Sequence, residues 1–460
     1  MPVYARRPRA SMAGPSPNGL SRTCSSKVQA GIAICAIAFG LVGCATQHAM
    51  MPTPVLYTGT SAKPLFDLPI DDRRPPLDLL FITDRAPAER AGELPYGAGR
   101  SRSMAFGSVT IDFGKDVTWD VLVRESLATE RAPALRLELG RTEEKGRFPP
   151  IPYELTAVPE GMVRRPAVVE AHEKAKQQLQ AEIARRINDA RRKEVVLFVN
   201  GYNSNFEGAA LAMGELCHFL GREFVCGIFS WPAGGRAGAL FGYEVDRESA
   251  EYATEDLVKA IRIVAGTPGV ERLHLLAHSR GAATLASALA VLSAEAYMLQ
   301  SSPTREFQIC NVVLIAPDVD ADVALTKIFK VFSDPDLPFG GKPEPGAVVP
   351  PSPGLEVTIY VSPDDQALAT AAWLSGSIAR LGRIDTTMFT PDQIEAIGML
   401  GAVNIIQVRG TTDFFGHSYF VSNPRVSSDI IAMLRYGLRP NDPGRPLEHV
   451  AGSFWRVSSP

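Results

Sequence analysis

The stretch LHLLAHSRGAATLASAL, Leu273–Leu289, decides the fold of this chain. Its first residues form an apolar run typical of a buried strand, and its alanine-rich second half is typical of a helix. Between them AHSRG (277–281) matches the pattern G-x-S-x-G, with Ala277 in place of the first glycine. Small residues are needed at both ends because the turn is tight. The pattern predicts Ser279 as an exposed nucleophile, with a helix-capping serine as the alternative.

A serine in such a turn needs an acid and a histidine that follow it along the chain. Only His417 and His449 lie downstream. His417 follows the apolar segment 403–409, from which a loop can reach across the strand ends, so we predict it as the base; a surface-loop histidine is the alternative. We expect His449, in a polar segment, to be structural or exposed. His274 and His278 are expected to pack or to form hydrogen bonds.

The acid is predicted on the loop that follows the expected strand 355–362. This loop reads SPDDQAL (362–368). A carboxylate there can accept the imidazole N–H and stabilise the imidazolium that forms during catalysis. We predict Asp365 in this role. Its neighbour Asp364 and the earlier Asp318 remain alternatives, although Asp318 or Asp320 is also placed to cap the following helix.

The oxyanion that forms during acyl transfer needs two backbone N–H donors. We predict the N–H of Arg280, directly after the nucleophile, and the N–H of Tyr202, in the loop NGYNSN (200–205). Gly201 lets the backbone of this loop approach a substrate closely. Asn200 is expected to brace the loop through side-chain hydrogen bonds.

Strands and helices alternate from residue 194 onwards, which predicts an α/β fold with a mostly parallel central sheet and helices on both faces. Earlier strands are expected to add an antiparallel N-terminal edge. The expected strands are 77–83, 104–114, 117–123, 194–200, 224–230, 271–277, 311–317, 355–362 and 403–409. The expected helices are 166–193, 206–220, 246–265 and 281–296.

The first 43 residues are expected to be a signal peptide and not part of the fold. Basic residues precede an apolar run, Val28–Gly43, that is too short to span a bilayer comfortably. The following LVGC (41–44) resembles the lipobox of bacterial lipoproteins. This resemblance implies cleavage before Cys44 and lipid attachment to its sulfur. An uncleaved anchor is the alternative, and translation from Met12 would leave the interpretation unchanged.

A lipid anchor implies a protein attached to a membrane of the bacterial cell envelope. In lipoproteins the residue after the cysteine influences sorting, and Ala45 favours the outer membrane, facing the periplasm. We expect the domains 1–43 (signal peptide), 44–76 (flexible tether), 77–436 (catalytic domain) and 437–460 (C-terminal tail). Within the catalytic domain we expect N-terminal strands in 77–165, a core in 166–436 and a Pro- and Gly-rich excursion at 331–354.

Composition argues against several classes of function. The net charge of −3 gives no reason to expect nucleic-acid binding. Seven histidines and six cysteines without a clustered pattern predict neither a metal site nor a cofactor. The mature chain would keep Cys217, Cys226 and Cys310, of which the first two could form a disulfide or stay reduced.

Several linked motifs occur in one order: LLFITDRA, VVLFVNGYNSNFEGAA, GIFSWPAGG, YEVDRESAEYA, LHLLAHSRGA, LIAPDVDADV, YVSPDDQAL and GHSYFVSNPRVSSDIIAML. Together they resemble an uncharacterised bacterial group of the esterase/lipase α/β-hydrolase superfamily, over about residues 77–436. The resemblance implies Ser279, Asp365 and His417 as a catalytic triad. One departure affects the oxyanion loop, because the group usually begins it with histidine and this chain has Asn200.

These features predict a serine hydrolase that cleaves carboxylic esters through an acyl-enzyme. The expected partners are a small-molecule or lipid-like ester and, through the anchor, a membrane. A non-catalytic envelope protein with the same fold is one alternative, and an acyltransferase with the same triad is another. The sequence leaves the substrate and the oligomeric state open.

Overall fold

The structure is a computed structural model. It describes residues 48–58, 65, 68–90, 93–131, 134–235, 238–324, 326–327, 355–376, 379–399, 401–410, 413 and 415–458. All of these belong to one compact unit, Gln47–Pro460. The expected signal peptide 1–43, the lipidation position Cys44 and the excursion 331–354 lie outside the described residues.

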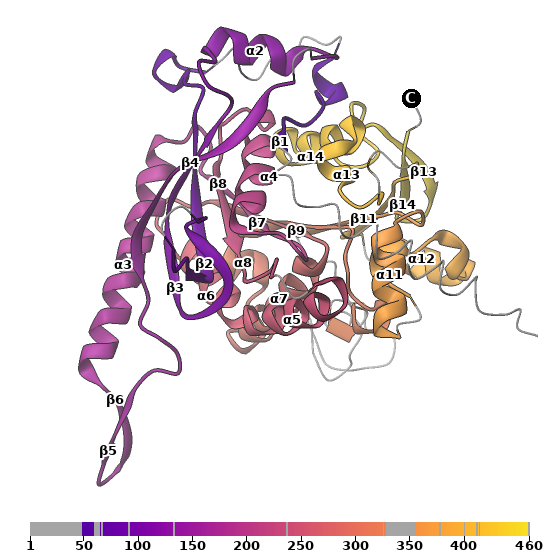
Figure 1. The fold of residues 1–460 in the computed structure, drawn as a ribbon. Coiled ribbons are helices and arrows are strands. Elements are labelled where there is room, and N and C mark those ends of the chain that lie inside the picture. Colours follow the sequence, from indigo (N-terminus) through magenta and orange to yellow (C-terminus); the bar gives the residue numbers. More distant parts are fainter. Residues whose placement is uncertain are drawn as a thin grey trace, which may run out of the picture. The chain divides into compact units, whose positions relative to one another are not determined.

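Within the described residues, twelve strands form one sheet in the order β1-β4-β3-β2-β8-β7-β9-β10-β11-β12-β14-β13 (Figure 1). Eight consecutive strands of this order are parallel: β2 (Leu77–Pro87), β8 (Val225–Ser230), β7 (Glu194–Val199), β9 (Arg272–His278), β10 (Ile309–Ile315), β11 (Glu356–Val361), β12 (Val403–Gln407) and β14 (Phe454–Val457). The antiparallel members are β3 (Tyr96–Asp112), β4 (Arg136–Arg147), β1 (His48–Ala49) and β13 (Leu447–Ala451). The predicted mostly parallel sheet with an antiparallel N-terminal edge is confirmed.

The central strands are apolar throughout because helices cover both faces of the sheet. In β7, Val195, Leu197 and Val199 pack into one core cluster, whereas Val196 and Phe198 pack into the other. Successive side chains of a strand point to opposite faces, so a continuous apolar run fills both layers. This arrangement explains why EVVLFVN lacks the alternation of a half-exposed strand.

Two groups of helices form the outer layers (Figure 1). Side chains of α3 (Pro166–Asp189), α5 (Gly238–Tyr252), α6 (Thr254–Ala265) and α7 (Arg280–Met298) enter the first cluster. Side chains of α4 (Phe206–Phe219) and α14 (Pro424–Tyr436) enter the second. The other α-helices of the described residues are α2 (Trp119–Leu127), α8 (Pro303–Phe307), α9 (Ala321–Ala324), α11 (Gln366–Ser375), α12 (Pro391–Met399) and α13 (Tyr419–Ser422).

The expected strand at 117–123 is wrong, because this segment begins helix α2. The Thr118 side chain accepts a hydrogen bond from the backbone N–H of Val121 at 3.4 Å, which caps the helix, and Asp120 lies in its first turn. Leu122 and Ser126 are buried at the i, i+4 spacing of one helical face. The apolar spacing of VTWDVLV fits both the two-residue period of a strand and the 3.6-residue period of a helix, and the Thr118 cap stabilises the helix.

The segment expected as one helix, 246–265, belongs to two. Helix α5 starts earlier, at Gly238, and ends at Tyr252, and α6 begins at Thr254. The other expected elements from 166 onwards are confirmed to within a few residues at their ends.

The expected tether at 44–76 is wrong for its described part. Strand β1 pairs with β4, and Met50, Met51 and Tyr57 are buried against the domain. The Met51 N–H donates to a carboxylate oxygen of buried Glu215 at 2.8 Å. Burial of these large side chains offsets the entropy of ordering a proline-rich segment, which composition alone does not reveal.

The expected C-terminal tail, 437–460, is also wrong, because it contributes two strands to the sheet. Strand β14 runs parallel to β12, and β13 returns antiparallel beside it. Phe454 is fully buried. His449 lies on β13 and is exposed, as expected for a residue outside the site. The four-residue strand FWRV is too short for its alternation to stand out in a polar segment.

A disulfide joins Cys217 in α4 to Cys226 in β8. The sequence left this pair open between a disulfide and free thiols. Cys310 is a free cysteine. The bond ties a helix of one layer directly to a parallel strand of the sheet.

Candidate active site

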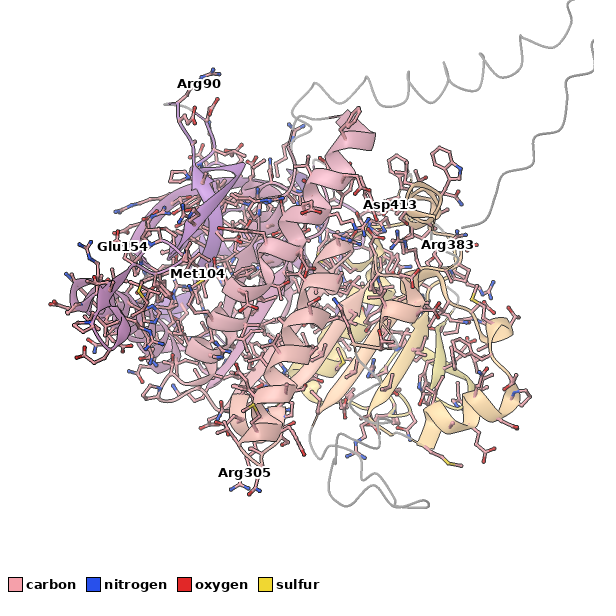
Figure 2. All side chains as sticks on the ribbon, turned by 90° about the horizontal axis from the view of Figure 1, so that it is seen from below. Arg90, Met104, Glu154, Arg305, Arg383 and Asp413 are labelled. Atoms are coloured by element: carbon pink, nitrogen blue, oxygen red, sulfur yellow. A yellow bond between two sulfur atoms is a disulfide. The ribbon has the colours of Figure 1, made fainter. Side chains whose placement is uncertain are left out.

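The predicted site residues come from loops at the carboxyl ends of parallel strands. Ser279 follows β9, Asp365 follows β11, and His417 lies beyond β12. Figure 2 labels Asp413, in the loop after β12, and Arg305, in α8 before β10, and the two residues lie far apart in this view. The carboxyl ends of parallel strands are where open α/β sheets bind ligands.

Ser279 sits in the turn between β9 and α7 with a strained backbone. Its φ of +53° lies in a region that non-glycine residues seldom adopt. Its N–H donates to the carbonyl of Ile315 at 2.9 Å, and its carbonyl accepts from the N–H of Asp318 at 3.0 Å. These bonds to the chain after β10 hold the turn in place. Strain that is supported in this way is common at functional sites.

Two glycines make room for this turn. A Cβ on Gly281 would lie 2.3 Å from the carbonyl oxygen of Asn200, and a Cβ on Gly201 would lie 2.8 Å from the Cβ of Ser279. Larger residues would therefore separate α7 and the 200–205 loop from the turn. The small residue expected two positions after the serine thus has a direct steric cause.

His417 and Asp365 are in direct contact. The imidazole Nδ1 lies 2.7 Å from a carboxylate oxygen of Asp365, whose side chain is fully buried. The second carboxylate oxygen accepts the N–H of Leu368 at 2.9 Å, which caps α11 and orients the carboxylate. On the other side, Asp413 accepts the N–H groups of His417 at 3.0 Å and Ser418 at 2.6 Å. The histidine loop is therefore fixed at both its backbone and its ring.

His278 joins this loop to the serine turn. Its Nε2 donates to the carbonyl of His417 at 3.1 Å, and the two rings lie 4.7 Å apart. Burial, together with the nearby charge of His417, lowers the pKa of His278 to about 3. His278 is thus neutral at physiological pH and serves as a hydrogen-bond donor, as the sequence predicted for it. Because it precedes Ser279, this bond brings His417 against the nucleophile turn.

The alternative acids have other partners. Asp364 is exposed and accepts the N–H of Gly410 at 3.4 Å. Asp318 accepts a hydrogen bond from the Tyr243 hydroxyl at 3.0 Å and pairs with Arg380. Asp320, not Asp318, caps the following helix, by accepting N–H groups of α9. Neither Asp364 nor Asp318 bonds to His417.

The 200–205 loop is braced by Asn200, as predicted. Its side-chain amide donates to the carbonyls of Gly201 at 3.2 Å and Ser204 at 3.4 Å, and its side-chain oxygen accepts the N–H of Trp231. The Trp231 indole donates to the Asn200 carbonyl at 2.5 Å and is fully buried. Asn200 therefore braces the loop from both its side-chain amide and its backbone carbonyl.

Arg85 also holds this loop, and sequence reasoning missed it. Its guanidinium is fully buried and donates to the carbonyls of Ser204 at 2.6 Å, Ala233 at 2.8 Å and Gly97 at 3.1 Å, and to the Ser230 hydroxyl at 2.8 Å. Burial lowers the pKa of Arg85 to about 10, so it remains a cation at neutral pH. The signal in the sequence is an Asp-Arg pair directly after the buried residues of LLFIT.

Asp246 on α5 is the second missed residue. Its buried carboxylate accepts the N–H of Asn203 at 2.9 Å and the N–H of Gly234 at 3.1 Å. It thereby ties the 200–205 loop to the loop after β8. Burial raises its pKa, which these two hydrogen bonds partly offset. A polar residue inside YEVDRESAEYA resembles a solvated helical face, so spacing does not single it out.

Among the described residues, no group of three or more His, Cys, Asp or Glu side chains is arranged to hold a metal ion. The hydrogen-bonded groups of the site are a serine turn, an Asp–His pair and a braced loop of backbone N–H groups. These are the components of nucleophilic acyl chemistry.

Comparison with curated proteins finds no match. Among solved structures, a "predicted CIB-like hydrolase" from Thermoplasma acidophilum is 12% identical, with a TM-score of 0.27, over 54% of this chain and 88% of that one. An esterase from Pyrobaculum calidifontis is 13% identical, with a TM-score of 0.25, over 58% and 92%. Esterase B from Lactobacillus rhamnosis is 13% identical, with a TM-score of 0.22, over 47% and 82%.

A family model matches the central part of the chain. Residues 175–435 match the family described as "Alpha/beta hydrolase of unknown function (DUF900)". This range contains the serine turn, the Asp–His pair and the braced loop. Since the match spans more than half of the 460 residues, the chain belongs to this family of alpha/beta hydrolases.

Proposed function

We propose that this protein is a serine hydrolase that cleaves carboxylic esters through an acyl-enzyme. Ser279 is the nucleophile, His417 the base and Asp365 the acid of this proposal. One observation carries it: His417 bonds to buried Asp365 while its carbonyl is held by the residue next to Ser279. Such a serine–histidine–carboxylate set is the usual means of activating a hydroxyl for attack on an ester.

In the proposed reaction the Ser279 hydroxyl attacks the ester carbonyl and His417 Nε2 takes its proton. Asp365, bonded to Nδ1, keeps the imidazole in the tautomer whose Nε2 is free to accept that proton. The backbone N–H groups of Arg280 and Tyr202 stabilise the oxyanion. The imidazolium then protonates the leaving alcohol, and water releases the acyl group in a second, equivalent half-reaction.

Braced backbone around the oxyanion supports this mechanism. The buried side chains of Asn200, Arg85 and Asp246 together make four hydrogen bonds to the backbone of the 200–205 loop. Donors that are already oriented need no reorganisation when the negative charge develops, which is the main source of their catalytic effect.

Labelling of the full chain in detergent by a fluorophosphonate tests the proposal. We expect the unmodified protein to react, and Ser279→Ala to lose both labelling and turnover, by about 10⁴- to 10⁶-fold in kcat. His417→Ala should react far more slowly, whereas His449→Ala, a change at an exposed histidine, should react normally. A folded but unreactive protein would point to the binding protein instead, and acyl transfer to an added alcohol in preference to water would point to an acyltransferase.

We further propose that the chain is a lipoprotein of the bacterial envelope, anchored through Cys44. The LVGC motif after a basic and then apolar N-terminal segment supports this proposal. Cys44→Ala should abolish incorporation of radioactive palmitate and block signal-peptide cleavage. Unchanged processing and membrane fractionation of this variant would refute the anchor, and Cys24→Ala is the matched control.

A further inference from the structure

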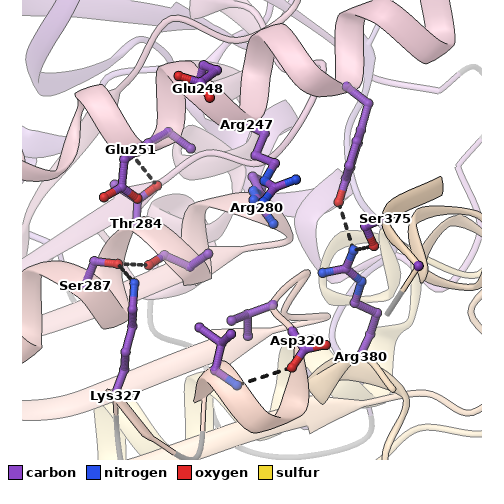
Figure 3. Close-up of a pocket in the computed structure, with 16 residues that line it drawn as sticks. Arg247, Glu248, Glu251, Arg280, Thr284, Ser287, Asp320, Lys327, Ser375 and Arg380 are labelled. Carbon is purple, nitrogen blue, oxygen red and sulfur yellow. Dashed lines mark hydrogen bonds between the residues drawn. The ribbon is translucent and has the colours of Figure 1, made fainter. Parts of the chain in front are cut away.

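A cavity of about 550 Å³ lies beside the serine turn and shares Arg280 with it (Figure 3). Its walls come from α5, from the first turns of α7, from residues 319–327 and from the end of α11. Figure 3 shows Arg280 in the middle of this view, with Arg380 and Ser375 on one side and Thr284 and Ser287 on the other. The cavity therefore starts at the residue next to the nucleophile.

The inner wall of the cavity carries more positive than negative charge. Arg380 pairs with Asp318, with Nε 3.4 Å from a carboxylate oxygen, and both side chains are buried. The Arg280 guanidinium is 3.9 Å from the other oxygen of the same carboxylate. Two guanidinium groups thus share one carboxylate. A buried cation without full compensation is costly unless a counter-charge binds beside it.

Arg280 also has an unused hydrogen-bond donor. One terminal nitrogen donates to the Asp318 carbonyl at 3.0 Å, whereas Nε is buried and has no acceptor among the described residues. A guanidinium presents several donors in a fixed plane that matches the oxygens of carboxylate and phosphate. The free donor and the excess charge both fit an anionic ligand.

Surrounding contacts hold Arg280 in position before a ligand arrives. Its guanidinium carbon lies 5.9 Å from the centre of the Tyr243 ring. The Tyr243 hydroxyl donates to Asp318 and accepts from Arg380 at 3.2 Å. Burial raises the pKa of Tyr243 to about 12, so the hydroxyl stays protonated. A side chain that is already ordered loses little entropy on binding.

Three acidic residues, Glu248, Glu251 and Asp320, also line the cavity, and the half-buried Asp320 carboxylate caps α9 by accepting the N–H groups of Asp322 and Val323. Glu248 and Glu251 on α5 are exposed, so water screens their charge. Two further cations line the cavity: half-buried Lys327, which donates to the Ser287 hydroxyl at 2.7 Å, and Arg247. Charges that are partly removed from water act more strongly on a ligand than those at the surface. The balance inside the cavity therefore favours an anion.

We propose that the cavity binds an anionic group of the substrate, a carboxylate or a phosphate, through the Arg280 side chain. This inference rests on the proposed function, since it places the anion one residue from Ser279. Arg280 would then have two roles: its backbone N–H faces the oxyanion, and its guanidinium selects esters that carry a negative charge a few bonds from the scissile carbonyl.

Pairs of esters that differ by one carboxylate test the proposal. In the first pair, 4-nitrophenyl hemiglutarate carries a carboxylate in its acyl group and 4-nitrophenyl butyrate does not. In the second pair, 4-carboxyphenyl butyrate carries a carboxylate in its leaving group and phenyl butyrate does not. We expect the full chain to prefer the charged member of at least one pair by about 10- to 100-fold in kcat/KM. Arg280→Gln keeps the backbone N–H and should abolish this preference.

The ratio within a pair removes any effect of Arg280→Gln on the chemical step, because both esters use the same nucleophile. Lys174→Gln on the exposed face of α3 removes the same charge outside the cavity and should leave the ratio unchanged. Slower fluorophosphonate labelling in glutarate or in inorganic phosphate would show which anion binds, and Arg280→Gln should lose the effect.

Three failures have different meanings. A protein that reacts with the fluorophosphonate but hydrolyses the members of both pairs equally would refute the anion site and leave the proposed hydrolase intact. A preference that survives in Arg280→Gln would refute the role of this side chain. A folded protein that neither reacts with the fluorophosphonate nor turns over any of the four esters would refute the proposed function and the inference together.

Discussion

At the scale of single residues, the site depends on how closely two backbone segments approach each other. The 200–205 loop and the serine turn are in contact through Gly201, and the turn meets the same loop again through Gly281. Gly201 and Gly281 are therefore required because no room is left for a Cβ at either position. The Asp–His pair depends instead on the orientation of the Asp365 carboxylate. One of its oxygens accepts the N–H of Leu368 in α11, and the other is bonded to His417 Nδ1.

We predict that Gly201→Ala lowers kcat/KM for a neutral nitrophenyl ester by about 100-fold, since a shift of about 1 Å at a reacting centre has an effect of this size. The added Cβ would meet Ser279 Cβ at 2.8 Å and His278 Nδ1 at 2.9 Å, and one side must move. Gly97→Ala is the control, because its Cβ would meet only ordinary contacts, at 3.9 Å and beyond. Equal kcat/KM in the two variants would show that the loop adapts freely.

Asp365→Asn should lower kcat by about 10⁴-fold while the melting temperature stays within a few degrees. The amide can still cap α11, but its NH₂ group facing His417 Nδ1 would stabilise the wrong imidazole tautomer. Asp364→Asn changes the neighbouring, exposed carboxylate and should leave kcat near normal. If Asp364→Asn proved the more damaging of the two, the assignment of the acid would be wrong.

At the scale of elements, buried charges attach helices and loops to the sheet. Glu182 on α3 pairs with Arg186 at 2.8 Å and with Lys145 of β4 at 2.8 Å. Arg186 in turn pairs with Asp78 of β2 at 2.8 Å. This cluster anchors a long amphipathic helix at the edge of the sheet. Arg85 has the corresponding role for the loops that follow β7 and β8.

Glu182 provides a pH-dependent prediction. Burial would raise its pKa, but hydrogen bonds from Arg185 and Lys145, with the charge of Arg186, lower it from 4.5 to about 2. A depressed carboxylate pKa stabilises the fold fully above about pH 4.5, and this stabilisation is lost as the pH falls towards 2. Glu182→Gln should therefore cost about 2–3 kcal/mol in the free energy of unfolding at pH 7, and much less at pH 3.

Urea titrations of the full chain at pH 7 and at pH 3 measure this difference. Glu173→Gln, at a half-exposed pair on the same helix, should change the free energy of unfolding by less than about 0.5 kcal/mol at either pH. An equal loss at both pH values for Glu182→Gln would show that its contribution is packing and not charge.

At the scale of the whole molecule, the sheet extends beyond the catalytic core at both ends. Strand β1 adds to the N-terminal edge, and β14 and β13 add to the C-terminal edge. The Cys217–Cys226 disulfide crosses from a helical layer to the sheet, between residues nine positions apart in sequence. A disulfide persists in an oxidising compartment, which fits the proposed envelope location.

Replacing both cysteines of this bond with alanine should lower the free energy of unfolding by about 2–3 kcal/mol, the loop-closure entropy of a loop of about ten residues. Dithiothreitol should lower the stability of the unmodified protein by a similar amount and leave the double variant unchanged. Cys310→Ala, at the free cysteine, should keep the sensitivity to dithiothreitol. Insensitivity of the unmodified protein to the reductant would contradict a structural disulfide.

The sequence by itself determined the parallel sheet, because strands buried on both faces must be apolar without interruption. EVVLFVN and ERLHLLA stand out for this reason, and the small residues of AHSRG follow from the tight turn. Positions after such strands also led to Asp365 and His417, which the fold brings into contact. The sequence of a single segment is sufficient to predict its structure where burial on both faces or a tight turn restricts which residues it can contain.

Only the tertiary structure decided which polar residues are buried and which short segments join the sheet. Arg85, Asp246 and Asp413 resemble solvated residues in the sequence, and their roles depend on partners far along the chain. The N-terminal segment and the strand Phe454–Val457 are too short or too polar for their periodicity to be read. Their burial results from surfaces that exist only once the remainder of the sheet has formed.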